Sequence, residues 1–208
     1  MTQVVAHFKA SKNILGISWQ EILPIVWEDY WLDHSSYDEF VNIRDTPGSF
    51  FVTSDNSNDN FLKDKNSYLK EKYLRHFCDF FTIKLGQKII GVVVCEILDW
   101  SSYYLRFITI EKEHRNKNLT LKFVSVVESV MANVGIDKVI CDVSPANLGQ
   151  VGRMSSAGYL CTGSFLSERF GANLRLTRYL SEDSKKKFDE NFIQIFYPRT
   201  SVTMPLKS

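Results

Sequence analysis

Hydrophobic periodicity changes near the middle of the chain, and this change limits the folds that the chain can adopt. Three β-branched and aromatic segments follow one another at residues 78–85, 88–98 and 103–111, and Gly86 and Gln87 form the first turn between them. Such runs predict a hairpin followed by a third strand. Directly after them, apolar residues recur at helical spacing at Leu119, Phe123, Val126, Val127, Val130, Met131 and Val134. The switch from strands to an amphipathic helix predicts a mixed α/β domain.

Helices are also expected before this segment. The first 15 residues include one strand candidate, Val4–Phe8. The sequence Ser-Trp-Gln-Glu at 18–21 is a capping box and predicts a helix that starts at Trp19. Its buried face would carry Ile22, Ile25, Val26 and Trp27, with Pro24 tolerated early or kinking the helix. The sequence Ser-Tyr-Asp-Glu at 36–39 repeats the signal and predicts a second short helix.

The chain after the central helix predicts alternating elements. Gly135 is a candidate helix terminator. We expect a strand at Lys138–Val143, a helix at Asn147–Ala157 and strands at Tyr159–Phe165 and Asn173–Leu180. Residues 1–180 therefore form one predicted domain, and residues 181–208 form a charged and aromatic tail. The Asn-, Asp- and Ser-rich stretch Ser54–Asn66 predicts a mobile loop.

Composition excludes several classes of protein. The chain has 208 residues and a formal net charge of +1, whereas nucleic-acid binders usually carry a clear basic excess. No apolar run approaches the ~20 residues of a membrane span, and no signal peptide is recognisable. The four cysteines stand singly in apolar stretches, without the Cys/His spacing of a metal site. We expect reduced core thiols, a cytoplasmic location and no metal.

The connection between residues 103–111 and the central helix is the candidate functional segment. Residues 113–120 read EHRNKNLT. A strand that enters a helix through a short loop directs free backbone N–H groups and the helix dipole at one point, a geometry that binds phosphate. Lys112, Arg115 and Lys117 add positive charge. The alternative is a solvated loop without a ligand.

This strand, loop and helix resemble motif A of the GNAT superfamily of acyl-CoA-dependent N-acyltransferases. Those proteins carry Gln/Arg-x-x-Gly-x-Gly/Ala in the loop, where backbone amides hold the pyrophosphate of coenzyme A. Arg115, Asn118 and Thr120 stand at these positions here, so both small residues differ. Asn tolerates left-handed backbone angles, so Asn118 can keep the turn. A second similarity follows residues 139–143, where Asn147, Met154, Gly158 and Tyr159 have the family's spacing.

The resemblance implies a fold and a donor. The fold is a single domain with a central mixed, mostly antiparallel sheet, flanked by helices and splayed between its fourth and fifth strands, residues 103–111 and 138–143. The donor is acetyl-CoA, whose pantetheine arm enters this gap. The implied binding residues are Ile108, Thr109 and Ile110 for the arm, with the Ile110 amide donating to the thioester carbonyl, and Arg115, Asn116, Lys117, Asn118, Leu119, Thr120 and Asn147 around the phosphates.

Catalytic residues are less clearly marked. The family's acid is a tyrosine, and Met154 in its place cannot donate a proton. Either Ser155 or a tyrosine from elsewhere supplies the proton, or the thiolate leaves unassisted. Glu96, in an otherwise apolar strand, is the candidate base, and the alternative is a solvent-facing carboxylate near a strand end.

Two sequence features point to different acceptors. Aromatic and acidic residues between positions 27 and 37 suit a cationic amine, namely Trp27, Glu28, Asp29, Tyr30, Trp31, Asp33 and Tyr37. Arg169, Arg175 and Arg178 suit an acidic acceptor instead. The favoured hypothesis is an N-acetyltransferase that acts on a primary amine of a small molecule, as a monomer or homodimer. The alternatives are a protein N-acetyltransferase and a non-catalytic module that binds acyl-CoA or a partner protein.

Overall fold

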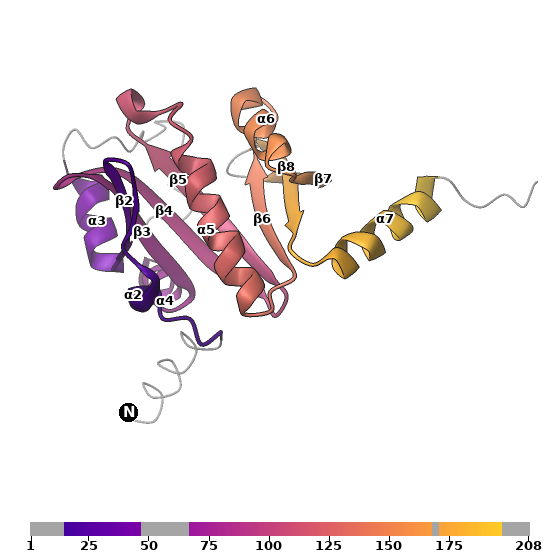
Figure 1. The fold of residues 1–208 in the computed structure, drawn as a ribbon, viewed down its shortest axis with the longest axis horizontal. Coiled ribbons are helices and arrows are strands. Elements are labelled where there is room, and N and C mark those ends of the chain that lie inside the picture. Colours follow the sequence, from indigo (N-terminus) through magenta and orange to yellow (C-terminus); the bar gives the residue numbers. More distant parts are fainter. Residues whose placement is uncertain (1–14, 47–66, 168–170, 197–208) are drawn as a thin grey trace, which may run out of the picture.

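The computed structural model describes residues 15–46, 67–167 and 171–196 (Figure 1). Within them, eight strands form one sheet in the order β1-β2-β3-β4-β5-β6-β8-β7. In chain order the helices and strands are α2 (Trp19–Ile22), β1 (Ile25–Trp27), β2 (Tyr30–Ser35), α3 (Tyr37–Asp45), α4 (Ser67–Phe77), β3 (Cys78–Leu85), β4 (Lys88–Asp99), β5 (Ser102–Ile110), the 3-10 turn η2 (Lys112–His114), α5 (Leu119–Asn133), β6 (Lys138–Val143), α6 (Leu148–Ser156), β7 (Leu160–Ser167), β8 (Gly171–Tyr179) and α7 (Glu182–Phe196).

The predicted fold class is confirmed. Among the described strands β5 and β6 pair in parallel, and every other neighbouring pair is antiparallel. The strands predicted at residues 78–85, 88–98, 103–111 and 138–143 are β3, β4, β5 and β6, and the central helix is α5. None of the described helices is long and apolar enough to cross a membrane.

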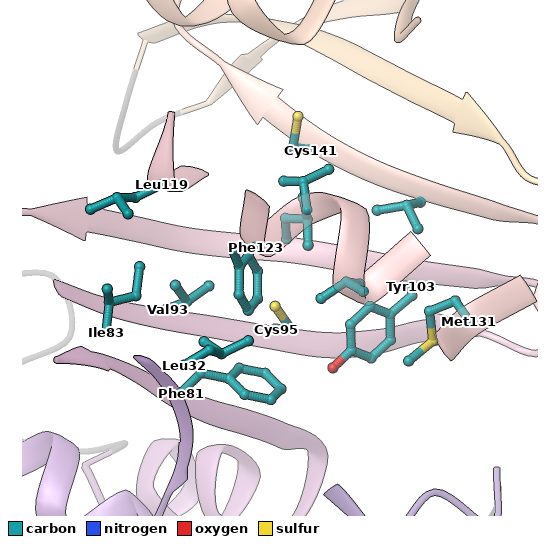
Figure 2. Packing of buried hydrophobic residues seen from close by; sticks show 14 of the residues in the cluster. Leu32, Phe81, Ile83, Val93, Cys95, Tyr103, Leu119, Phe123, Met131 and Cys141 are labelled. Carbon is teal, nitrogen blue, oxygen red and sulfur yellow. The ribbon is translucent and has the colours of Figure 1, made fainter. Parts of the chain in front are cut away.

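Helices cover both faces of the sheet. The larger core cluster lies between α5 and one face, where Phe123 of α5 packs with Phe81, Val93, Cys95 and Tyr103 of the sheet (Figure 2). These side chains are fully buried. The smaller cluster lies under α3 and α4 on the opposite face, and it contains Phe40, Leu74, Cys78, Phe80, Val92 and Val94. The two faces of the sheet can therefore be told apart by the cluster to which each strand residue belongs.

A β-bulge in β5 opens the middle of the sheet. Val94 pairs with Phe107 and Cys95 pairs with Leu105, which leaves Arg106 as an extra residue on β5. A bulge bends its strand and increases the local twist. The parallel pairing of β5 with β6 ends at the same level, because it covers only Ser102–Leu105 against Lys138–Cys141. This divergence is the splay expected between the fourth and fifth strands.

The helix predicted from Trp19 through Trp27 is wrong. Helix α2 ends at Ile22, and Ile25–Trp27 forms β1, the outer strand of a hairpin with β2. Pro24 explains the difference, because it lacks an amide proton and disfavours helical geometry in the residue before it. The side chain of Ser18 makes no capping bond, whereas Ser36 accepts a hydrogen bond from the Glu39 amide at 3.1 Å and starts α3 as predicted.

The structure contains two helices that the sequence analysis did not predict. Helix α4 precedes β3, and α7 occupies most of the predicted tail and leads away from the sheet (Figure 1). The ring of Phe188 in α7 lies 5.2 Å from that of Tyr179 at the end of β8. The strand expected at Val4–Phe8 and the loop expected at Ser54–Asn66 lie outside the described residues.

Candidate active site

A cleft of about 550 Å³ lies where β5 and β6 diverge. It is bounded by the second half of β5, the loop before α5, the end of β6 and the start of α6. Its lining comprises Leu105, Arg106, Phe107, Ile108, Thr109, Ile110, His114, Arg115, Asn116, Asn118, Leu119, Thr120, Cys141, Asp142, Val143, Ser144, Asn147, Gln150, Arg153 and Met154. The predicted binding set is therefore gathered around one cleft, with the exception of Lys117.

The β5 wall is built by the bulge. Beyond Leu105, β5 pairs with no strand of the described residues on the β6 side, and the backbone of residues 106–110 borders the cleft there. Ile108, Thr109 and Ile110 all line it. The Ile110 carbonyl accepts a hydrogen bond from Arg115 Nε at 2.9 Å, which ties the loop to the end of the strand. Unpaired strand backbone of this kind can bind a ligand through its amides.

The loop before α5 is a tight turn with two left-handed residues. Asn118 has a φ of 57° and Asn116 a φ of 64°. The geometry predicted for Asn118 is confirmed, and the similar geometry of Asn116 was missed. The side chain of Asn118 does not cap the helix, and no acidic residue lies in the first turn of α5. Among the described residues nothing accepts from the amides of Leu119 and Thr120, and this 15-residue helix directs its N-terminus at the cleft.

Lys117 points away from the cleft. Its Nζ lies 2.9 Å from the Tyr30 hydroxyl, and Tyr30 also contacts His114 Nδ1 at 3.0 Å. Because Tyr30 is nearly buried in β2, these bonds fix the loop to the neighbouring part of the sheet. His114 lines the cleft, although it was not among the predicted residues. The positive charge of the loop therefore reaches the cleft through Arg115 rather than through Lys117.

The α6 wall combines a cap, a cation and a core residue. The Asn147 side chain accepts a hydrogen bond from the Gln150 amide at 3.2 Å and starts α6. Arg153, which sequence reasoning missed, also lines the cleft. Met154 is fully buried and packs in the large core cluster while it borders the cleft. Ser155 is exposed and is not among the lining residues, so its position does not favour it as the acid.

Glu96 lies on the face of the sheet that α3 and α4 cover, opposite α5, and forms an ion pair with Arg106. Its carboxylate is 4% exposed and contacts Arg106 Nη1 at 2.8 Å. It also accepts hydrogen bonds from the Tyr73 hydroxyl at 2.8 Å and the Cys78 thiol at 3.4 Å. Burial and the neighbouring Glu96 raise the pKa of Tyr73 to about 12, so Tyr73 stays a neutral donor. Glu96 is therefore surrounded by donors and is not among the residues that line the cleft.

A second carboxylate, Asp142, stands at the cleft where the parallel pairing ends. Arg175 donates to it from both Nε and Nη2 at 2.9 Å, and the Tyr104 hydroxyl donates to it at 3.0 Å. Burial and this carboxylate raise the pKa of Tyr104 well above its usual value. The available signal for Asp142 was its position as a charged residue inside the apolar strand of residues 138–143.

Solved structures share the fold at low sequence identity. A ribosomal-protein-S5-alanine acetyltransferase from Vibrio fischeri superposes with a TM-score of 0.56 at 14% identity, and the match covers 77% of this chain and 98% of that one. A spermidine/spermine N-acetyltransferase from Vibrio cholerae gives a TM-score of 0.53 at 16% identity, covering 76% and 96%. A GNAT family acetyltransferase from Elizabethkingia anophelis with acetyl-CoA bound gives 0.50 at 15% identity, covering 74% and 99%.

Sequence comparison at the family level agrees with the structural comparison. No curated protein matches the chain significantly in sequence. The model of the acetyltransferase (GNAT) family matches residues 17–159, which is more than half of the chain and includes both walls of the cleft. Taken with the splayed sheet and the loop before α5, this match means that the chain belongs to the GNAT family of acetyltransferases.

Proposed function

We propose that this enzyme transfers the acetyl group of acetyl-CoA to a primary amine of a small molecule. The observation that carries the proposal is the cleft between β5 and β6, which combines unpaired strand backbone with the N-terminus of α5. Strand amides suit the amide-bearing arm of coenzyme A, and a helix N-terminus suits its phosphates. The volume of about 550 Å³ lies within the range of small-molecule sites.

The donor has a proposed position within this cleft. Ile108, Thr109 and Ile110 would bind the arm, and the Ile110 amide would donate to the thioester oxygen as it becomes anionic. The phosphates would lie against residues 115–120 and Asn147. Arg153 of α6 is a second cation on the same cleft. The acetyl-CoA bound to the Elizabethkingia anophelis protein supports a donor of this class.

The chemistry needs few side chains. The neutral amine attacks the thioester carbon, a C–N bond forms, the C–S bond breaks, and coenzyme A leaves as a thiol with the amine's proton. Glu96 and Ser155 lie outside the lining residues, so the proposal gives neither of them the proton transfer. Met154 fills the core at the family's acid position, which favours departure of the thiolate without a side-chain acid.

The proposed compartment is the cytoplasm. All four cysteines are free thiols; Cys78, Cys95 and Cys141 are buried as expected of core thiols, whereas Cys161 is exposed, contrary to that expectation. Unpaired cysteines in this number are typical of proteins kept in a reducing compartment.

Isothermal titration calorimetry with acetyl-CoA tests the donor site. The native chain should bind it, and Arg115→Glu should weaken binding about ten- to hundredfold, because a charge-assisted contact is replaced by repulsion beside the phosphates. Lys112→Glu is the matched control, since Lys112 is exposed, lies three residues away and does not line the cleft. Its affinity should stay near that of the native chain. Equal affinities of the native chain and Arg115→Glu would place the phosphates elsewhere.

A further inference from the structure

Two arginines lie beside the cleft on the face of the sheet opposite α5: Arg106 lines it, and Arg175 is joined to it through the lining residue Asp142. Arg106 is the bulge residue of β5, and Arg175 belongs to β8. Asp142 lies between Cys141 and Val143, which both pack in the α5-side cluster, so its side chain points to the other face, and Arg175 is its cross-strand partner there. Arg106 reaches that same face through Glu96, whose other neighbour, Cys78, belongs to the cluster under α3 and α4.

Each arginine is held by a carboxylate beneath it. The Glu96 and Asp142 side chains are 4% and 10% exposed, whereas those of Arg106 and Arg175 are 43% and 40% exposed. The buried partners fix the direction of each guanidinium, and their own oxygens are used by Arg, Tyr and Cys donors. The more exposed groups on this side of the cleft are therefore the two guanidinium groups, while the oxygens of Glu96 and Asp142 are already bonded to donors.

Both guanidinium groups keep donors for a ligand. Arg106 uses only Nη1 for Glu96, and within the described chain its Nε and Nη2 have no hydrogen-bond acceptor. Arg175 uses Nε and Nη2 for Asp142, which leaves Nη1 without an acceptor among the same residues. Guanidinium groups with free N–H groups in a fixed direction suit carboxylate or phosphate oxygens.

Tyr104 joins the two ion pairs into one surface. It stands opposite Glu96 on β4, opposite Ile140 on β6, and two residues before Arg106 on its own strand. Its hydroxyl donates to Asp142. Both Arg106 and Arg175 lie close enough to Tyr104 to oppose the rise in its pKa. The two guanidinium groups therefore flank the point where β5 and β6 separate.

The competing acidic residues lie on the hairpin of β1 and β2, behind the loop before α5, and the charges of two of them are partnered. Asp33 of β2 is paired with Lys84 at 2.8 Å, and Glu28 with Lys122 at 3.2 Å. Strands β3 and β4 separate this hairpin from β5. None of the aromatic or acidic residues expected to hold a cationic amine lines the cleft.

Resting on the proposed function, we infer that the acceptor amine also carries an anionic group, a carboxylate or a phosphate, which Arg106 and Arg175 bind at the rim of the cleft. Their outer N–H groups hold the anion, and the amine of the same molecule enters between β5 and β6 toward the thioester. Glu96 and Asp142 are positioning residues, because they act through the arginines. Arg106 and Arg175 determine specificity for the acceptor and take no part in binding the donor.

Release of the coenzyme A thiol from acetyl-CoA, measured over matched amines, tests this inference. The panel pairs each standard amino acid with its carboxamide and O-phosphoethanolamine with ethanolamine, and it includes spermidine as a cation without an anionic group. The anionic member of a pair should be used with a kcat/KM about tenfold higher or more, since charge-assisted hydrogen bonds are lost in the neutral member. The favoured pair tells a carboxylate acceptor from a phosphate acceptor.

Variants locate the effect. Arg106→Gln and Arg175→Gln should each raise the KM for the anionic amine about tenfold, with the KM for acetyl-CoA and the use of the neutral amine unchanged. Arg75→Gln is the control, because Arg75 of α4 is paired with Asp38 and Glu71 and does not line the cleft. Since Arg106→Gln leaves Glu96 buried without its cation, Glu96→Gln/Arg106→Gln serves as a second variant, and calorimetry with acetyl-CoA verifies its fold.

The outcomes separate this inference from the proposed function. A native chain that does not bind acetyl-CoA overturns both. A chain that binds acetyl-CoA but uses carboxamides, ethanolamine or spermidine as well as the anionic amines, or uses no anionic amine, overturns only the inference. An unchanged KM for the anionic amine in both Arg106→Gln and Arg175→Gln would also overturn only the inference.

Discussion

At the residue scale, the loop before α5 depends on backbone angles that few residues adopt. Asn116 and Asn118 both lie in the left-handed region, where a Cβ atom is unfavourable by roughly 1–2 kcal/mol and only Gly is free of the strain. Asn adopts these angles more readily than most residues other than Gly. The loop therefore keeps the turn that glycine gives to other members of the family, with asparagine in its place.

Asn118 gives a direct test of this backbone strain. Asn118→Ala should lower the free energy of unfolding by about 1 kcal/mol relative to Asn118→Gly, measured by urea denaturation. Asn133 in the last turn of α5 is exposed and lacks a positive φ, so Ala should be better than Gly at that position. The same order of stabilities at both sites would contradict the argument.

Sequence reasoning at this scale succeeded for local geometry and failed for distant contacts. Asn118 could be predicted because its angle depends on its own side chain and a short motif. The direction of Lys117 could not, since its partner Tyr30 lies 87 positions away in the sequence. The ion pair of Glu96 could not be predicted either, because its partner Arg106 comes next to it only when β4 and β5 are paired.

At the element scale, the largest departure from expectation is the hairpin of β1 and β2. The apolar residues Ile22, Ile25 and Val26 fit a helical face by spacing alone, but Pro24 interrupts the helix, and Val26 is 63% exposed. Periodicity in so short a window does not separate a helix from a strand. The break at Pro24 was the more reliable signal.

The turn of this hairpin carries a strained residue. Trp27 pairs with Tyr30, so Glu28 and Asp29 form a two-residue turn, and Glu28 has a φ of 59°. Glu28→Gly should raise the free energy of unfolding by about 1 kcal/mol or less, because the relief of roughly 1–2 kcal/mol of left-handed strain exceeds the entropy that glycine adds to the unfolded chain. The lost ion pair with Lys122 offsets little of this, since the Glu28 side chain is 78% exposed. Asp29→Gly should give no such gain, because the φ of Asp29 is not positive. Urea denaturation of both variants measures the two free energies of unfolding.

The bulge in β5 left a readable trace in the sequence. Tyr103 and Leu105 face α5 before the bulge, and Ile108 and Ile110 pack in the same cluster after it. A regular strand would keep odd-numbered residues on that face throughout. This change of phase marks Arg106. The pair of Arg106 and Arg175 could not be anticipated, because it also depends on the pairing of β6 with β8, which places Arg175 opposite Asp142.

At the scale of the whole molecule, the chain divides into a sheet domain and a C-terminal helix. The Leu180 amide donates to the Asp137 carbonyl at 2.8 Å and closes the domain, and α7 beyond it leads away (Figure 1). We propose that residues 1–180 suffice for the fold and the donor site.

Truncation tests this division. A chain that ends at Leu180 should remain folded and bind acetyl-CoA with unchanged affinity, with only a small loss of thermal stability from the missing contact between Phe188 and Tyr179. A chain that ends at Ser167 should not fold, because β8 lies between β6 and β7 and joins them. Thermal melts followed by circular dichroism test whether each chain folds, and calorimetry with acetyl-CoA tests whether it binds the donor. Loss of binding in the chain that ends at Leu180 would show that α7 contributes to the domain.

The short parallel overlap of β5 and β6 has a mechanical consequence. Among the described residues, the strand pairing of β5 with β6 covers four residue pairs, and this short ladder, backed by α5, joins the part of the sheet from β1 to β5 to the part from β6 to β7. The two parts of the sheet are therefore joined near one end of β5 and β6 and lie on either side of the cleft beyond it. We expect a ligand in the cleft to contact both parts of the sheet and to restrict their movement relative to each other, so binding of the donor should also stabilise the sheet.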